Sequence, residues 1–121
     1  MSVVSAQEIH TPFWGSGARL WLWEGMVKDD TGEPVPCPHY ADKSVMVTGA
    51  NGTGGKVTIQ GSNDPEASDW FTLNDPFGDA LTPADGEGGA LAENTYLVRP
   101  NVAAGDGDTL FDVYLLVVSG R

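Results

Sequence analysis

The sequence predicts an all-β protein: an antiparallel β-sandwich with jelly-roll or immunoglobulin-like connectivity and an extended N-terminal arm. Three observations support this fold class. Apolar and polar residues alternate along most strand-like segments, and glycine (16 residues) and proline (8 residues) separate those segments. No segment keeps helical spacing over ten residues. We expect residues 1–17 to form the arm and residues 18–121 to form one domain of about seven or eight short strands.

Three segments show the clearest strand alternation, at residues 43–50, 56–62 and 95–103. A period of two in β-branched residues indicates a strand with one buried face. The residues expected on those buried faces are Val45 and Val47, then Val57 and Ile59, then Tyr96, Val98 and Val102. Asn51-Gly52 and Asp106-Gly107 are typical of hairpin turns, and we expect the second to join the last two strands.

Two other segments are apolar on both faces. In residues 18–26, Leu20 and Leu22 alternate with Trp21 and Trp23. In residues 109–118 one face carries an apolar series, and Leu116 and Val118 stand on the opposite face. A strand with two apolar faces is normally covered on both, and monomers avoid large exposed apolar patches. We therefore expect the tryptophan face to be buried between chains of a homo-oligomer; the alternative is that residues 9–14 of the same chain cover it.

Residues 1–17 are interpreted as an arm because Pro12 cannot donate to a strand ladder and the Gly15–Gly17 segment forms a flexible joint. Phe13 and Trp14 are the residues expected to reach a neighbouring subunit. The candidate interface set comprises Phe13, Trp14, Trp21, Trp23, Leu116 and Val118.

Charge limits the possible partners. Seventeen acidic residues against six basic ones give a net charge of −11, and no basic residue occurs between Val57 and Val98. Such a surface repels phosphate backbones, so nucleic-acid binding is disfavoured. The longest apolar run, Val113–Val118, is six residues, whereas a membrane-spanning helix needs about 20. We expect neither nucleic acid nor membrane as a partner.

Candidate catalytic and metal-binding residues are few. Cys37 and His39 form a C-x-H pair without the second pair that a zinc site needs, and His10 stands alone. The 62–69 and 105–108 segments carry oxygen donors that could hold Ca²⁺, but Asp and Asn also favour turns for local reasons. We predict no catalytic residue, cofactor or metal, and no enzymatic activity. A single cysteine and the lack of a secretory signal fit synthesis in a host cytoplasm.

The order of motifs from about Trp23 to Leu116 resembles a family of small virion proteins of tailed bacteriophages. The matching stretches are YADKSVMVTG (40–49), VTIQGSNDPEASDWFTLNDPFGDAL (57–81) and ENTYLVRPNVAAGDG (93–107). The PEAS segment (65–68) departs from the shorter turn expected in that family. The resemblance implies a head decoration or minor capsid component, often oligomeric, that sits on the shell.

The GSND…W stretch (61–70) is also similar to discoidin-type sugar- and lipid-binding domains. That resemblance implies that Ser62, Asn63 and Asp64 join two strands and that Trp70 packs in the core. In a carbohydrate-binding module, Trp21, Trp23 and Tyr114 would be the exposed aromatic residues.

The sequence thus favours a non-enzymatic capsid decoration (cement) protein on the virion surface, bound to the major capsid protein as a homo-oligomer, preferably a trimer. The alternatives are a carbohydrate-binding module and a tail or baseplate component.

Overall fold

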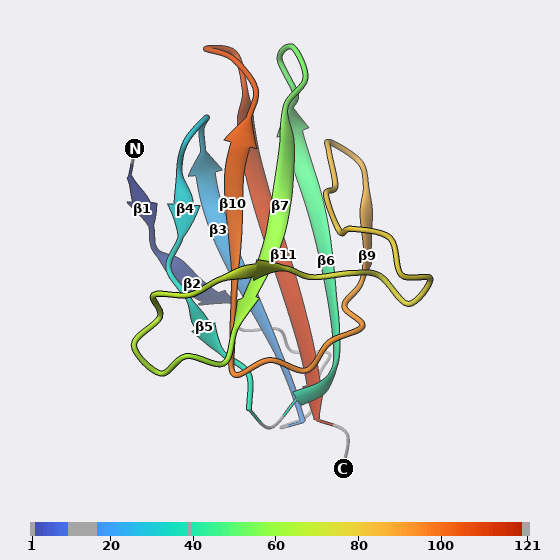
Figure 1. Cartoon of the computed structure of the whole chain (residues 1–121). Coiled ribbons are helices and arrows are strands. Elements are labelled where there is room, and N and C mark those ends of the chain that lie inside the picture. The colour runs from blue at the N-terminus through green and yellow to red at the C-terminus, as the bar shows by residue number, and fades with distance from the viewer. Residues whose placement is uncertain (1, 10–16, 39, 120–121) are drawn as a thin grey trace.

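The structure, a computed structural model, describes residues 2–9, 17–38 and 40–119. Two β-sheets face each other and form a sandwich, and no helix occurs in the described part of the chain (Figure 1). We call them the β10 sheet and the β11 sheet after their central strands. The predicted β-sandwich is confirmed.

The β10 sheet has the order β1-β4-β10-β7-β8, and β5 also pairs with β10. Its strands are β1 (Val3–Val4), β4 (Thr31–Gly32), β5 (Val35–Pro36), β7 (Lys56–Ser62), β8 (Phe71–Thr72) and β10 (Leu97–Ala104). The β11 sheet has the order β2-β3-β11-β6-β9. Its strands are β2 (Ala6–Ile9), β3 (Ala18–Met26), β6 (Tyr40–Ala50), β9 (Gly88–Ala90) and β11 (Leu110–Ser119).

The connectivity is that of a jelly roll. From β3 onward only two connections, β4 to β5 and β7 to β8, stay within the β10 sheet, and all the others cross from one sheet to the other. The last strand, β11, lies between β3 and β6, and β10 lies between β4 and β7. Interleaving of this kind is characteristic of two nested Greek keys. The structure therefore decides between the two connectivities that the sequence left open.

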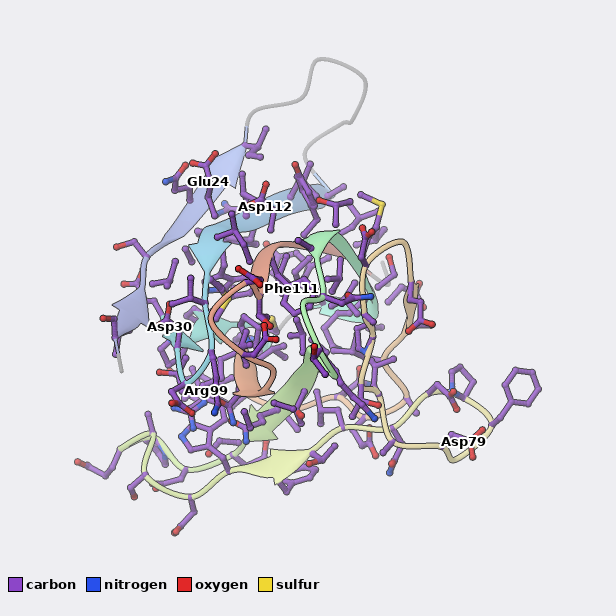
Figure 2. The ribbon with its side chains drawn as sticks, turned by 90° about the horizontal axis from the view of Figure 1, so that it is seen from above. Glu24, Asp30, Asp79, Arg99, Phe111 and Asp112 are labelled. Atoms are coloured by element: carbon purple, nitrogen blue, oxygen red, sulfur yellow. The ribbon has the colours of Figure 1, made fainter. Side chains whose placement is uncertain are left out.

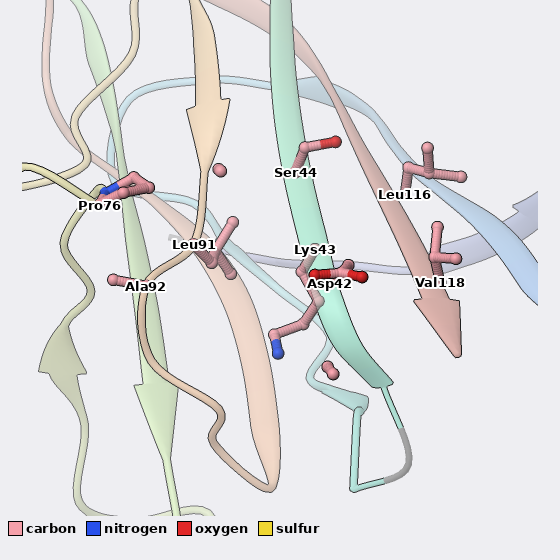
Figure 3. A pocket seen from close by; sticks show the side chains of 10 residues that line it. Asp42, Lys43, Ser44, Pro76, Leu91, Ala92, Leu116 and Val118 are labelled. Carbon is pink, nitrogen blue, oxygen red and sulfur yellow. The ribbon is translucent and has the colours of Figure 1, made fainter. Parts of the chain in front are cut away.

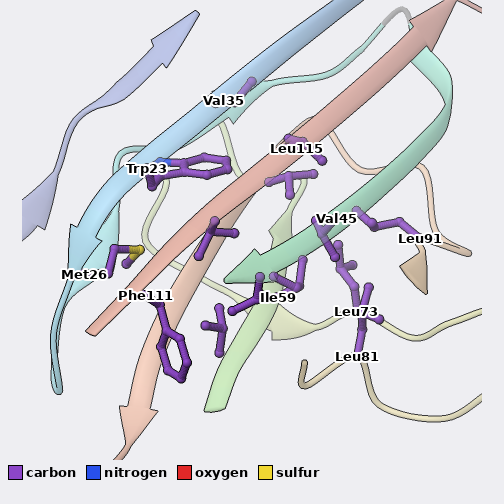
Figure 4. Packing of buried hydrophobic residues seen from close by; sticks show 14 of the residues in the cluster. Trp23, Met26, Val35, Val45, Ile59, Leu73, Leu81, Leu91, Phe111 and Leu115 are labelled. Atoms are coloured by element: carbon purple, nitrogen blue, oxygen red, sulfur yellow. The ribbon is translucent and has the colours of Figure 1, made fainter. Parts of the chain in front are cut away.

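The core fills the space between the sheets with one contiguous apolar cluster (Figure 4). Strand alternation predicted most of it: Val45, Val47, Val57 and Ile59 are all buried. The predicted face of β10 is correct for Val98 and Val102 but not for Tyr96, which is 42% exposed. Tyr96 precedes the first residue of β10, where its backbone N–H donates to Asn63 Oδ1 (2.9 Å), so alternation along the strand does not determine its position.

The two glycine turns do not close hairpins, which corrects the sequence prediction. The Asn51-Gly52 turn connects β6 to β7, and the Asp106-Gly107 turn connects β10 to β11, so each passes between sheets. The turns bind each other at one end of the sandwich: Thr109 Oγ1 donates to Asn51 O (2.7 Å) and Thr53 N donates to Asp106 Oδ2 (3.1 Å). Turn chemistry permits a reversal of the chain, but tertiary packing determines which sheet the next strand joins.

Residues 2–9 are built into both sheets, whereas the sequence predicted an arm over residues 1–17. β1 pairs in parallel with β4, and β2 pairs antiparallel with β3. Asp30, whose side chain is buried, holds this segment: Oδ1 accepts from Ser2 N (3.1 Å) and Oδ2 accepts from Val27 N (2.9 Å). The neighbouring Gly32 admits no side chain, because a Cβ there would lie 2.6 Å from Trp23 Nε1.

Candidate functional site

The tryptophans of β3 point into the sandwich. Trp21 and Trp23 are paired with Leu115 and Val113 of β11, whose side chains fill the core, so the indoles share their side of the sheet. Trp23 is 1% exposed, and its Nε1 donates to Glu33 O (2.9 Å). Trp21 is half-buried against the core. The tryptophan face expected between chains is therefore an internal face.

The opposite face of the same strands is the apolar outer surface of the molecule. Strand register places its side chains in two cross-strand rows. One row consists of Ile9, Leu20, Leu116, Ser44 and Ala90, and the next of Gln7, Leu22, Tyr114, Met46 and Gly88. Leu116 and Val118, predicted from alternation to stand opposite the core, are half-buried on this face. We call these two rows, with Val118, the apolar outer face.

Neither row contains a charged residue, although the chain has a net charge of −11. Acidic residues occur beyond the rows: Asp42 is paired with Val118 at one end, and Asp112 is paired with Thr48 at the other. Asp112 accepts a hydrogen bond from the backbone N–H of Gly25 (2.9 Å), the residue that follows Glu24 in the chain. The charge pattern thus leaves the centre of the sheet apolar and places carboxylates at its ends.

An open hollow of about 620 Å³ adjoins this face at its β9 edge (Figure 3). Leu116 and Val118 border it on one side, and Pro76, Leu91 and Ala92 on the other. Lys43 also lines it, with a buried side chain whose Nζ donates to Asn94 Oδ1 (2.7 Å) and Tyr40 O (2.9 Å). A mainly aliphatic hollow with its ammonium group already bonded suits an apolar side chain better than a charged ligand.

Burial governs the two unusual titratable groups near this hollow. Desolvation lowers the pKa of Lys43, and the nearby Cys37 and Asp42 partly offset that effect. Burial raises the pKa of the Cys37 thiol to about 11, against the opposing influence of Lys43. A thiol that is 2% exposed and protonated at neutral pH is a poor nucleophile. Cys37 packs in the core cluster, and this position gives it a structural role.

The outer face of the β10 sheet is mainly polar, with Val3 as an exposed apolar residue at its edge. Its cross-strand rows consist of Val3, Thr31, Asn101 and Thr58, and of Arg99, Gln60 and Thr72. The Arg99 guanidinium lies 4.0 Å from the Trp70 ring centroid, and its Nε donates to Gln60 Oε1 (2.8 Å). Trp70 thus lies under Arg99 on this face, which corrects the expectation that it packs in the core. The turn that precedes it does join two paired strands, β7 and β8, as predicted.

The two acidic turns use their carboxylates internally. Asp64 accepts hydrogen bonds from Ser68 Oγ, Glu66 N and Ser68 N, which lower its pKa. Asp106 accepts from Asp108 N and Thr53 N, which lower its pKa in the same way. Among the residues that the structure describes, no three His, Cys, Asp or Glu side chains gather as a metal site would require. These contacts show Asp64 acting as a local turn residue, and Asp106 both shaping its own turn and linking it to the 51–53 turn.

Several residues singled out from the sequence lie outside the described residues: Phe13 and Trp14 of the interface set, Pro12 and Gly15 of the expected arm, and the two histidines, His10 and His39. The sequence set also missed Leu20, Leu22, Met46 and Tyr114 as members of the outer face. Their alternation with core residues was visible, but alternation alone does not tell which face is inside. No helix in the described ranges is long and apolar enough to cross a membrane.

Comparison with known proteins supports the fold. The crystal structure of SPBc2 prophage-derived protein YomS superposes with a TM-score of 0.62 at 16% sequence identity, over 84% of this chain and 95% of that chain. No model of a protein family matches the chain, and no curated protein matches it in sequence. At this identity, the likeness to YomS extends to the fold.

Proposed function

We propose that this chain is a non-enzymatic structural protein of a bacteriophage particle: a decoration protein that binds the major capsid protein on the outside of the head, as a homotrimer. The observation that carries the proposal is the apolar outer face, two adjacent rows of uncharged positions in a chain with a net charge of −11. Such a face is typical of surfaces that contact other protein.

The fold supports this proposal by analogy. YomS, which has the same fold, is prophage-derived, and jelly rolls are common in viral capsid proteins. The charge of the chain supports a position on the outside of a shell, because a strongly acidic protein is repelled from packaged DNA.

Decoration stabilises a shell by bridging its subunits. Every 100 Å² of apolar surface buried contributes about 2.5 kcal/mol before the costs of association. Copies on a repeating lattice act multivalently, so a modest contact per copy suffices to oppose separation of the subunits. The acidic residues at both ends of the β11 sheet would remain in solvent and keep the free protein soluble.

The carbohydrate-binding alternative loses its main residues. Of the three aromatics that would stack on a sugar, Trp23 is buried and Trp21 is half-buried against the core, which leaves Tyr114 alone on the outer face. Trp70, the other tryptophan described, has Arg99 over its ring. A tail or baseplate protein would use the same apolar face, so the experiment below distinguishes that location from decoration of the head.

The test mixes purified protein with heads and with tails of the phage whose genome encodes it, both made without this protein. We expect saturable binding to heads. Sedimentation of the free protein should give the mass of three chains. Heads already carrying the protein serve as the occupied control. Binding confined to tails, or to neither structure, would contradict decoration of the head.

A further inference from the structure

The turn between Leu73 and Leu81 exposes a phenylalanine without cover. Phe77 is 92% exposed, compared with 67% for Val3, the next most exposed large apolar side chain among the described residues. The turn extends from the body of the sandwich in both overall views (Figures 1 and 2), with Asp79 near its end. The two leucines that flank it are buried in the core. A loop fixed at both ends therefore holds its most apolar residue in solvent.

Hydrogen bonds fix the shape of this turn. Asp75 N donates to Asp79 O (2.8 Å) and Gly78 N donates to Asp75 O (3.0 Å). The Asp75 carboxylate accepts from Phe77 N (2.9 Å) and Asp79 N (3.1 Å) through one oxygen, Oδ1. Below the turn, an isolated bridge joins Asn74 to Ala80, and Glu93 accepts from Asn74 N and Nδ2 (2.8 and 2.9 Å). The backbone of Phe77 is thus ordered before any contact, which lowers the entropic cost of binding.

The charge around Phe77 is negative. Asp75 and Asp79 flank it, and the chain carries no basic residue from Val57 to Val98. Within the described ranges the only ion pair is Arg19–Glu8, so neither aspartate is neutralised by a cation there. An aromatic side chain between two carboxylates is complementary to an apolar pocket with a basic rim.

The turn also adjoins the apolar outer face. Pro76, next to Phe77 in the chain, lines the same hollow as Leu116 and Val118 (Figure 3). A partner that covers the outer face would therefore lie close to the turn.

We propose that the Asp75–Asp79 turn is an anchor: Phe77 inserts into an apolar pocket of the protein to which this chain attaches, and lysine or arginine on the rim of that pocket faces Asp75 and Asp79. This inference rests on the proposed function, since the partner is the shell protein. A second copy of the chain is a poorer partner, because it would bring the two aspartates toward Asp42 beside the hollow and add a further charge of −11.

The experiment measures attachment to heads lacking the protein for wild type, Phe77→Ala and Phe71→Ala. Phe71 is the matched control, an exposed phenylalanine (45%) on β8. Loss of a central aromatic anchor is expected to weaken binding about 30-fold or more, and the control less than about 3-fold. Thermal unfolding should be the same for all three proteins, since neither ring is in the core.

A second pair of variants tests the basic rim. Asp79→Lys is compared with Glu66→Lys, which changes net charge equally in the exposed 64–69 turn. We expect Asp79→Lys to weaken attachment at least about 10-fold more than Glu66→Lys at low salt, with the difference shrinking as salt rises.

Four outcomes would overturn parts of this picture, and they are distinguishable. If wild type and Phe77→Ala attach equally well, the anchor is wrong while head attachment stands. If Asp79→Lys behaves as Glu66→Lys does, the basic rim is wrong. If Phe77→Ala converts the free oligomer to monomers in sedimentation, a second copy is the partner and a basic shell pocket is not. If wild type does not attach to heads, the proposed function fails and the anchor fails with it.

Discussion

The two outer faces of the sandwich differ in what they offer to solvent. On the β10 sheet, most cross-strand positions are polar: one row holds Thr31, Asn101 and Thr58 beside Val3, and the next holds Arg99, Gln60 and Thr72. Arg99 finds its partners within the face, in Gln60 and the Trp70 ring. On the β11 sheet, the equivalent rows carry mostly apolar side chains, with Gln7 and Ser44 as the polar members. Most of these side chains are half-buried or exposed, and Leu22 is buried.

The difference shows that only one of the two sheets has more apolar surface than the core of the sandwich uses. A sandwich needs one apolar face per sheet, and the core supplies that for both. The β10 sheet satisfies the simple rule of one face packed and one face in water. The β11 sheet exceeds it, because β3 and β11 are apolar on both sides. The excess contributes nothing to the core, and we propose that it serves a contact with another chain.

The most direct way to break this comparison is to place the same charge on each outer face. Leu116→Arg on the β11 sheet is expected to weaken oligomerisation and head attachment about 30-fold or more, since it puts an unpaired charge in a buried contact. Thr58→Arg on the β10 sheet should change oligomerisation and head attachment by less than about 3-fold relative to wild type. Sedimentation and head binding provide the measurements, with circular dichroism to show that both variants fold. Equal effects of the two variants would remove the distinction between the faces.

A smaller effect should sharpen the comparison from the polar side. Arg99→Ala removes the contact with the Trp70 ring and the hydrogen bond to Gln60, and is expected to lower the free energy of unfolding by about 1 kcal/mol. Attachment should not change, because Arg99 satisfies its partners within the chain. Arg19→Ala is the control: Arg19 is half exposed in a 3.5 Å pair with Glu8, and its loss should cost about 0.5 kcal/mol or less. Urea titration measures the free energy of unfolding of both variants. If Arg99→Ala lost attachment, the β10 sheet would take part in binding, and the assignment of binding to the apolar outer face would be wrong.

The sequence predicted the fold class and most of the core because alternation in β6, β7, β10 and β11 directly reports which residues share a face. It did not predict the orientation of β3. Leu20/Leu22 and Trp21/Trp23 are both apolar pairs, so their spacing carries no information about which pair is inside. The pairing of Trp23 with Val113 and the acceptor at Glu33 O decide it, and both are long-range contacts.

Other features depended on contacts that no local pattern encodes. The glycine turns at 51–52 and 106–107 have hairpin chemistry, yet each connects the two sheets because its flanking strands pair elsewhere. A proline and a glycine joint indicated an N-terminal arm, but Asp30 supplies acceptors for Ser2 and Val27 and fixes the start of the segment on the β10 sheet. Phe77 gave no signal at all, since one apolar residue in a turn is ordinary until its exposure is known.

The smallest expected effect concerns the end of the sandwich, where the two sheets are joined and neither face is involved. Hydrogen bonds from Asp108 N and Thr53 N lower the pKa of Asp106 from 3.8, so the ionised carboxylate stabilises the folded state. Because the pKa is lower in the folded than in the unfolded chain, this stabilisation is present above about pH 4 and is lost as the pH falls through the folded-state pKa. Asp106→Asn should therefore melt at a lower temperature than wild type at pH 7, and the gap should narrow toward pH 3. Glu66→Gln, which removes an equal charge from another turn, is the control for net charge. If the difference in melting temperature between Asp106→Asn and wild type stayed constant from pH 7 to pH 3, the carboxylate would not contribute through its charge. Attachment through the apolar outer face should be unaffected at pH 7 in both variants.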